Sequence, residues 1–162
     1  MTKRRDLLNA PVITIDEGAE AGRVTGLIVD AISARVMALA VSTEKPFEAP
    51  KAVPFPLVQG FGEDAVMIEN KSAITEFSSL PELIAIGKTD SDLCGLRVIA
   101  RTGKAIGYVE DFAVEDDTGR IISFLVRLAG QSITVDIDIE KIITIGSSAL
   151  VVTADTLCLV ES

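Results

Sequence analysis

Ile133-Thr134-Val135-Asp136-Ile137-Asp138-Ile139-Glu140 is the stretch that decides the fold, because apolar and polar residues alternate strictly along it. Successive side chains of a β-strand point to opposite faces of the sheet, so a period of two gives one apolar and one polar face. We expect the four apolar residues, from Ile133 to Ile139, to face a core. The stretch therefore predicts a half-buried strand and favours an all-β fold.

The residues before this strand predict a hairpin. Residues 106–114 and 120–128 are rich in β-branched and apolar side chains, and they flank the turn Glu115-Asp116-Asp117-Thr118-Gly119. Gly119 supplies the permissive backbone that a short hairpin loop needs. Residues 150–153 predict a further short buried strand. Five or six short strands joined by tight turns are typical of a small antiparallel barrel or sandwich.

The chain contains two copies of this pattern. The aligned segments and their offsets are 7–13 with 93–99 (86), Gly22 with Gly107 and Arg35 with Arg120 (85), and 61–66 with 145–150 (84). The offset drifts by only two residues over the whole repeat, which indicates a duplication. We predict a first domain over residues 1–78, a linker over 79–91 and a second domain over 92–162. Within the linker, Leu80–Ile86 is expected to form one or two helical turns, followed by a loop over 87–92.

Composition narrows the classes of function. Lys and Arg total 15 while Asp and Glu total 24, giving a formal net charge of −9, which disfavours nucleic acid as a partner. The longest uncharged stretch, residues 142–154, is too short for a membrane-spanning helix, so no integral membrane segment is expected. Histidine is absent, which removes the commonest general base and transition-metal ligand. Cys94 and Cys158 show no CxxC spacing, and we interpret them as reduced packing residues of a cytoplasmic protein.

Two groups of polar residues are candidate sites. Asp136, Asp138 and Glu140 form an acidic stripe on one strand face, which can bind a divalent cation, dock a basic partner or simply face water. Arg35 and Arg120 occupy matched repeat positions at the start of the second strand of each hairpin, where a binding role is one alternative. The residues alone support no catalytic site, no bound metal and no cofactor.

The second copy resembles the PRC-barrel family. The family pattern has an apolar strand, a glycine turn, Gly-x-Val-x-Asp, an acidic turn with glycine, and a closing Ile-Gly-x-x-x segment followed by apolar residues. The matching segments are Arg97-Val98-Ile99, Gly103, Gly107-Tyr108-Val109-Glu110-Asp111, Asp117-Thr118-Gly119-Arg120, Ile121–Val126 and Ile145–Val152. The resemblance covers most of residues 93–159, and at its acidic position Asp111 is expected to hydrogen bond turn amides and set the barrel geometry.

The first copy departs from that pattern in three places. Gly26 stands where the family tends to carry an acidic residue, and Ile32-Ser33-Ala34 replaces the acidic turn with its glycine. The segment 45–56 holds four prolines, which cannot donate to a strand ladder, so its strand is expected to be broken or to lie at an edge. An exposed edge near residues 51–57 is a candidate for pairing with a second copy of the chain.

The resemblance implies two tandem small antiparallel barrels joined by a short helical linker. Related barrels occur in the cytoplasmic part of the reaction-centre H subunit and in a ribosome maturation factor, where the barrel docks onto a protein. We therefore expect a non-catalytic interaction module that docks a protein partner or forms a homodimer. The alternative is a regulatory protein that binds a ligand or divalent metal between the barrels; an enzyme would have to act through carboxylates alone.

Overall fold

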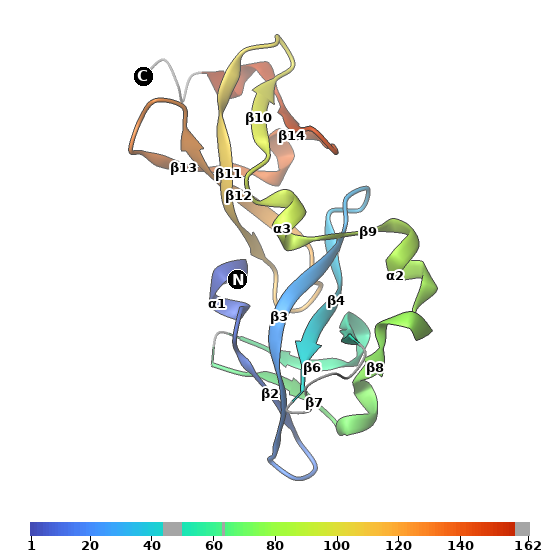
Figure 1. Cartoon of the computed structure of the whole chain (residues 1–162). Coiled ribbons are helices and arrows are strands. Elements are labelled where there is room, and N and C mark those ends of the chain that lie inside the picture. The colour runs from blue at the N-terminus through green and yellow to red at the C-terminus, as the bar shows by residue number, and fades with distance from the viewer. Residues whose placement is uncertain (44–49, 63, 158–162) are drawn as a thin grey trace.

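The protein consists of two curled sheets that lie end to end, each forming a partly open barrel (Figure 1). The computed structural model describes residues 1–43, 50–62 and 64–157. Strands make up 52% of the chain and helical segments 18%, which confirms the all-β prediction. None of the helices in these described ranges is long and apolar enough to cross a membrane.

The first barrel is an eight-stranded sheet in the order β6-β7-β2-β3-β4-β5-β8, with β9 paired to β3 off this path. Its strands are β2 (Pro11–Thr14), β3 (Glu20–Asp30), β4 (Arg35–Ser42), β5 (Lys51–Pro54), β6 (Val58–Phe61), β7 (Val66–Ile68) and β8 (Thr75–Glu76). Three 3-10 turns accompany them: Phe55–Leu57, Lys71–Ala73 and Phe77–Ser79. All neighbours pair antiparallel except β2 and β7.

The second barrel repeats this topology in the order β13-β12-β11-β10-β15-β14. Its strands are β10 (Arg97–Ala100), β11 (Ala105–Val114), β12 (Ile121–Leu128), β13 (Thr134–Asp138), β14 (Ile142–Ile145) and β15 (Ala149–Val152). Two 3-10 turns accompany them, Ile139–Lys141 and Ala154–Leu157. The parallel pair β10–β15 corresponds to β2–β7. The match of strand order and of the one parallel pair confirms the duplication.

The paired glycines of the repeat have a steric cause. A Cβ built on Gly107 would lie 1.9 Å from the carbonyl oxygen of Arg127 on the neighbouring strand, and a Cβ on Gly22 would lie 2.5 Å from that of Ser42. Each long hairpin therefore brings one backbone against the other at its base, where only glycine fits. This contact explains why the Gly-x-Val segment appears in both copies.

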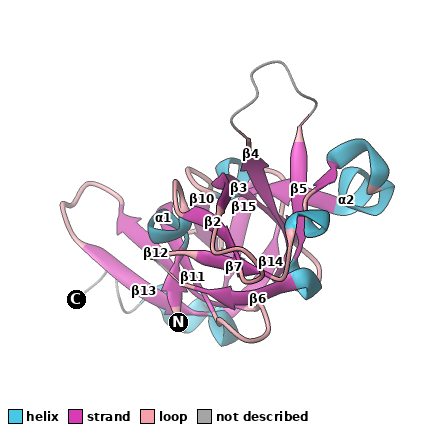
Figure 2. Cartoon of the chain, turned by 90° about the horizontal axis from the view of Figure 1, so that it is seen from below, coloured by secondary structure: helices cyan, strands magenta, loops and turns pink. Residues whose placement is uncertain are grey.

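The segment that precedes each barrel in the sequence packs against the sheet of the other barrel. The N-terminal arm consists of β1 (Thr2–Lys3) and α1 (Arg4–Leu7), and its strand β1 pairs with β11 of the second barrel. The middle arm consists of β9 (Gly87–Thr89) and α3 (Asp90–Leu93), and its strand β9 pairs with β3 of the first barrel. The helix expected in the linker is present as α2 (Pro81–Ile86), which lies beside β5 at the outside of the first barrel (Figure 2).

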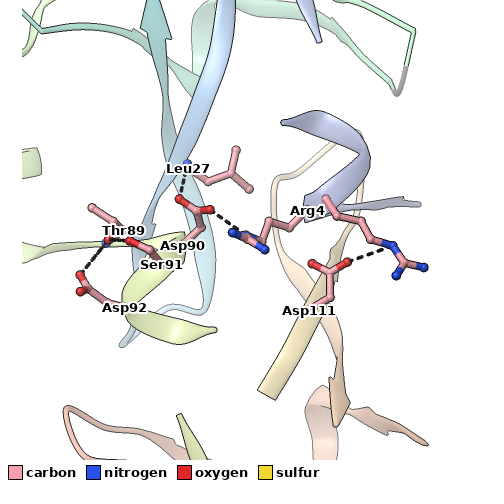
Figure 3. Close-up of polar contacts among 8 residues, drawn as sticks. Arg4, Leu27, Thr89, Asp90, Ser91, Asp92 and Asp111 are labelled. Atoms are coloured by element: carbon pink, nitrogen blue, oxygen red, sulfur yellow. Dashed lines mark hydrogen bonds and ion pairs between the residues drawn. The ribbon is translucent and has the colours of Figure 1, made fainter. Parts of the chain in front are cut away.

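The loop predicted over residues 87–92 is wrong, because the middle arm is ordered by its neighbours. Its strand β9 pairs with β3, with Lys88 opposite Val29 and Thr89 opposite Ile28. The following helix starts at Asp90 and is capped by Thr89, whose backbone N–H and hydroxyl both donate to Asp92 Oδ2 at 3.0 Å (Figure 3). Polar residues that indicate a loop in isolation here serve as a helix cap.

The deciding stretch forms a shorter strand than predicted. Ile137 is buried, and Val135 and Ile139 pack against the core, as expected. Ile133 is 55% exposed, because β13 begins one residue later at Thr134. The strand also ends at Asp138, whose carboxylate accepts a hydrogen bond from the Glu140 backbone N–H and caps the following 3-10 turn.

The predicted free edge at residues 51–57 is also wrong. β5 covers only Lys51–Pro54, and it has a strand on both sides, since Lys51 and Ala52 also pair with β8. Pro54 stands at the end of β5, where a missing N–H does least harm to the ladder. Of the four prolines, Pro46 lies outside the described residues.

One hydrophobic core runs through both barrels. Val29 and Val36 from the first half belong to the same buried cluster as Val114 and Ile121 from the second. A smaller cluster under α2 contains Leu83, Ile28, Ala38 and Ala52. Because the main cluster is continuous, the two halves form one packed unit and not two independent domains joined by a linker.

Candidate functional site

The two long hairpins meet at their tips. The Val36 N–H donates to the Gly119 carbonyl at 2.7 Å, and the Ile121 N–H donates to the Ala34 carbonyl at 2.8 Å. Arg35 and Arg120 lie opposite each other in an isolated antiparallel bridge. These contacts are reciprocal, so the repeat is related by a pseudo-twofold axis that passes between the two arginines. Their shared position thus belongs to the joint between the barrels.

A largely buried ion pair lies near the same axis, between the arms. Arg4 Nε donates to Asp90 Oδ2 at 2.6 Å, and the two side chains are 18% and 7% exposed (Figure 3). The other Asp90 oxygen accepts from the Leu27 N–H at 3.0 Å. Removing one partner of a buried pair commonly costs about 3–5 kcal/mol, because the other charge is left without compensation.

Asp111 is the second carboxylate under the arms. Its side chain is 1% exposed, and the nearest cation is Arg5, whose Nε lies 3.6 Å from Oδ2. Neither oxygen makes a hydrogen bond of standard geometry with the described residues, and the amides that act on the carboxylate, those of Phe112 and Arg5, belong to β11 and α1 and not to a turn as expected. Burial raises the pKa of Asp111 above its usual value, although the Phe112 and Arg5 amides and the guanidiniums of Arg4 and Arg5 oppose this change.

The thiol of Cys94 lies beside this charged cluster. Burial raises the pKa of Cys94 to about 11, with Arg4 opposing the increase and Asp111 and Asp90 reinforcing it. Near neutral pH such a group is a thiol and not a nucleophilic thiolate. Cys94 therefore serves as a packing residue, as the sequence predicts, while Cys158 lies outside the described residues.

An apolar groove opens where both barrels and α2 come together. Its volume is about 300 Å³. The residues that line it are Arg35, Val36, Met37, Pro54, Phe55, Pro56, Leu80, Glu82, Leu83 and Thr118. Phe55 of the first barrel packs against the tip of the second hairpin, since a Cβ on Gly119 would lie 3.1 Å from its ring. The second barrel contributes Thr118 to the lining, while the other lining residues belong to the first half of the chain.

A family model for the PRC-barrel domain matches residues 1–75 and, a second time, residues 87–157. The chain belongs to the PRC-barrel family. A search of curated proteins found no match to it.

Membership of the PRC-barrel family is consistent with the exposed apolar groove. Domains of this family are generally non-catalytic and often act as interaction modules. Both matched ranges begin with an arm, so each PRC-barrel unit includes the arm that pairs with the other barrel.

The acidic stripe is not a continuous surface of one PRC-barrel strand. Asp136 and Asp138 are exposed on β13, but Glu140 lies on the 3-10 turn beyond it. In the ranges that the structure describes, no group of three or more Asp, Glu or Cys side chains is placed to hold a metal ion. A role of the stripe in docking a basic partner stays a prediction.

Sequence reasoning found some of the residues at the joint and missed others. Arg35 and Arg120 were visible as matched repeat positions, and the structure places both at the bridge. The arms were missed, because strands of two and three residues leave no periodic signal. Arg4 aligns with Asp90 at the offset of 86, and that charge reversal within a repeat was the available signal.

Proposed function

We propose that the two barrels act together as one non-catalytic docking module for a protein partner. The observation that carries this proposal is the apolar groove of about 300 Å³, to which both barrels and α2 contribute. Exposed concave apolar surface is typical of interaction sites. Family membership supports the same class of function.

The groove favours a partner segment with apolar side chains and charged flanks. Met37, Phe55 and Leu80 are half-buried in its wall, while Arg35 and Glu82 are exposed at its rim. Apolar anchors that fill such a groove supply most of the affinity, and rim charges set the orientation. The net charge of −9 favours a basic partner surface around that segment.

The test is capture of partners from native lysate with the full chain, at low and high salt, followed by crosslinking mass spectrometry. Met37→Glu places a charge in the groove and should abolish capture. Ile143→Glu is the matched control, since Ile143 is 47% exposed on β14 and does not line the groove. Crosslinks should map to the groove walls. If both variants capture the same proteins, or a monomeric wild type captures nothing at low salt, the proposal fails.

The groove volume also lies at the lower end of the range for small-molecule sites, which favours a ligand-regulated protein as the second candidate. Thermal melts of the full chain against divalent cations and a metabolite panel separate the two candidates. A ligand that binds the native state raises the melting temperature with its concentration. An increase that Met37→Glu abolishes would favour the ligand function over docking.

A further inference from the structure

The two arms carry opposite charges at equivalent positions. Lys3 pairs with Ala113 and Thr89 pairs with Ile28, so the arms superpose at an offset of 86 and their strand partners at an offset of 85. By this relation Arg4 on the N-terminal arm corresponds to Asp90 on the middle arm. These two residues form the ion pair near the pseudo-twofold axis, with Nε and Oδ2 2.6 Å apart.

The strands under the arms differ in a matching way. Gly26 on β3 corresponds to Asp111 on β11 at the offset of 85. A Cβ on Gly26 would lie 2.9 Å from Asp90 Oδ1, so the middle arm's carboxylate occupies the space that a side chain there would need. The N-terminal arm instead carries Arg4 and Arg5 over the buried Asp111. An acidic arm thus covers a glycine, and a basic arm covers an acid.

We propose that these four positions, Arg4, Gly26, Asp90 and Asp111, form a pairing code that makes the first barrel dock onto the second and prevents either barrel from docking onto a copy of itself. The surface under each arm fits one kind of partner, a barrel whose arm carries the complementary charge.

The two self-pairings fail for electrostatic reasons. If two first barrels docked in the same way, Arg4 would face another Arg4 at the axis, and Gly26 would offer neither arm a carboxylate. If two second barrels docked, Asp90 would face another Asp90, with Asp111 buried beneath each arm. Like charges brought together at a desolvated interface cost several kcal/mol, so only the mixed pair is stable.

The test begins with the full folded chain, cut after folding at a protease site placed in α2. This helix lies outside both ranges matched by the family model, and Pro81, Glu82 and Ala85 are exposed. Native mass spectrometry and dilution then measure how the two pieces associate. We expect a mixed 1:1 pair only. Homopairs of either piece in the wild type would overturn the proposal.

Charge reversal at Arg4 is the second part of the test. Arg4→Asp should weaken the mixed pair at least about tenfold, equivalent to about 1.4 kcal/mol. The matched control is Arg23→Asp, which removes an exposed arginine that pairs with Glu20 at 3.1 Å and donates to the Asn9 carbonyl at 2.9 Å, but contacts neither Asp90 nor Asp111 within the ion pairs of the described residues. An Arg4→Asp effect no larger than that of Arg23→Asp would refute the code.

If the single variants unfold, a variant that exchanges the residues of all four positions between the two halves still tests the proposal. The quadruple variant Arg4→Asp, Gly26→Asp, Asp90→Arg, Asp111→Gly moves each charge to its equivalent position in the other half. It should regain most of the association, or, measured on the uncut chain by far-ultraviolet circular dichroism, most of the folded signal that Arg4→Asp loses. A quadruple variant as impaired as Arg4→Asp alone would overturn the proposal.

Discussion

Replacing Gly107 with alanine tests the steric argument for the repeated glycines. The new Cβ would lie 1.9 Å from the Arg127 carbonyl oxygen and 3.1 Å from the Leu128 Cα. Carbon–oxygen contacts between neighbouring strands are about 3.3–3.6 Å, so β11 and β12 must separate by about 1.4 Å or more at this point. The atoms that the Cβ would meet all belong to the backbone, and no side chain can rotate away to relieve the contact.

The expected loss of stability follows from the ladder. Separation at the Gly107–Leu128 pair stretches the hydrogen bonds on either side of it, such as that from the Ala129 N–H to the Ile106 carbonyl at 2.9 Å. If about two buried backbone bonds are lost at about 1–2 kcal/mol each, unfolding becomes easier by about 2–4 kcal/mol. For a chain of this length, a loss near 3 kcal/mol lowers the Tm by roughly 6–12 °C.

Urea unfolding followed by circular dichroism measures this change, with a thermal melt as the second readout. Gly62→Ala is the matched control, because the nearest atom to its Cβ lies 4.0 Å away and its backbone is not left-handed. Gly22→Ala, whose Cβ would lie 2.5 Å from the Ser42 carbonyl oxygen, should behave like Gly107→Ala. If Gly107→Ala costs less than about 1 kcal/mol, or no more than Gly62→Ala, the steric reasoning is refuted.

Three further variants test the backbone, the buried acid and the thiol. Ala34 holds a left-handed φ of 54° where its repeat equivalent is Gly119, so Ala34→Gly should raise the free energy of unfolding by roughly 0.5–1 kcal/mol; an unchanged or lower urea midpoint would argue against strain. The pKa of Asp111 is raised above 3.8 in the folded state, so the native protein holds this proton more tightly than the unfolded chain. The free energy of unfolding should therefore fall as the pH rises from 3.8 through the raised pKa, by about 1.4 kcal/mol for each pH unit between the unfolded-state and folded-state pKa values. Urea midpoints measured against pH should change less over this range in Asp111→Asn than in the wild type; the same pH dependence in both proteins would contradict the assignment. With the pKa of Cys94 at about 11, its thiol in a Cys158→Ser background should react with a thiol reagent at pH 8 about 100-fold more slowly than in urea; equal rates would show that the thiol is not buried.

The sequence predicted what is periodic and repeated. The alternation near Ile137 indicated the strand and its buried face, and the offsets of 84 to 86 indicated the duplication. The limits of that strand were less predictable, because Ile133 has the right residue type but lies one residue before β13 begins, and its side chain is exposed. Hydrophobic pattern determines the face of a strand, while its ends depend on the neighbouring strand.

Contacts between the halves were beyond the reach of local patterns. The arms form strands of two and three residues, which are stabilised by β11 and β3 and not by their own composition. Asp90, in a polar run that indicates a loop, becomes buried because Arg4 and the Leu27 N–H satisfy its carboxylate. Such long-range compensation leaves no signal within a short window of sequence.

The exchange of arms also sets an order of events during translation. Thr2 is made before its partner Val114, which follows 112 residues later. At about 5–20 residues per second, β1 waits roughly 6–20 s for the strand that it joins. Until residues 87–89 are made, the emerging first barrel exposes the side of β3 that β9 later covers, which is an opportunity for a chaperone or for another nascent copy on the same messenger RNA.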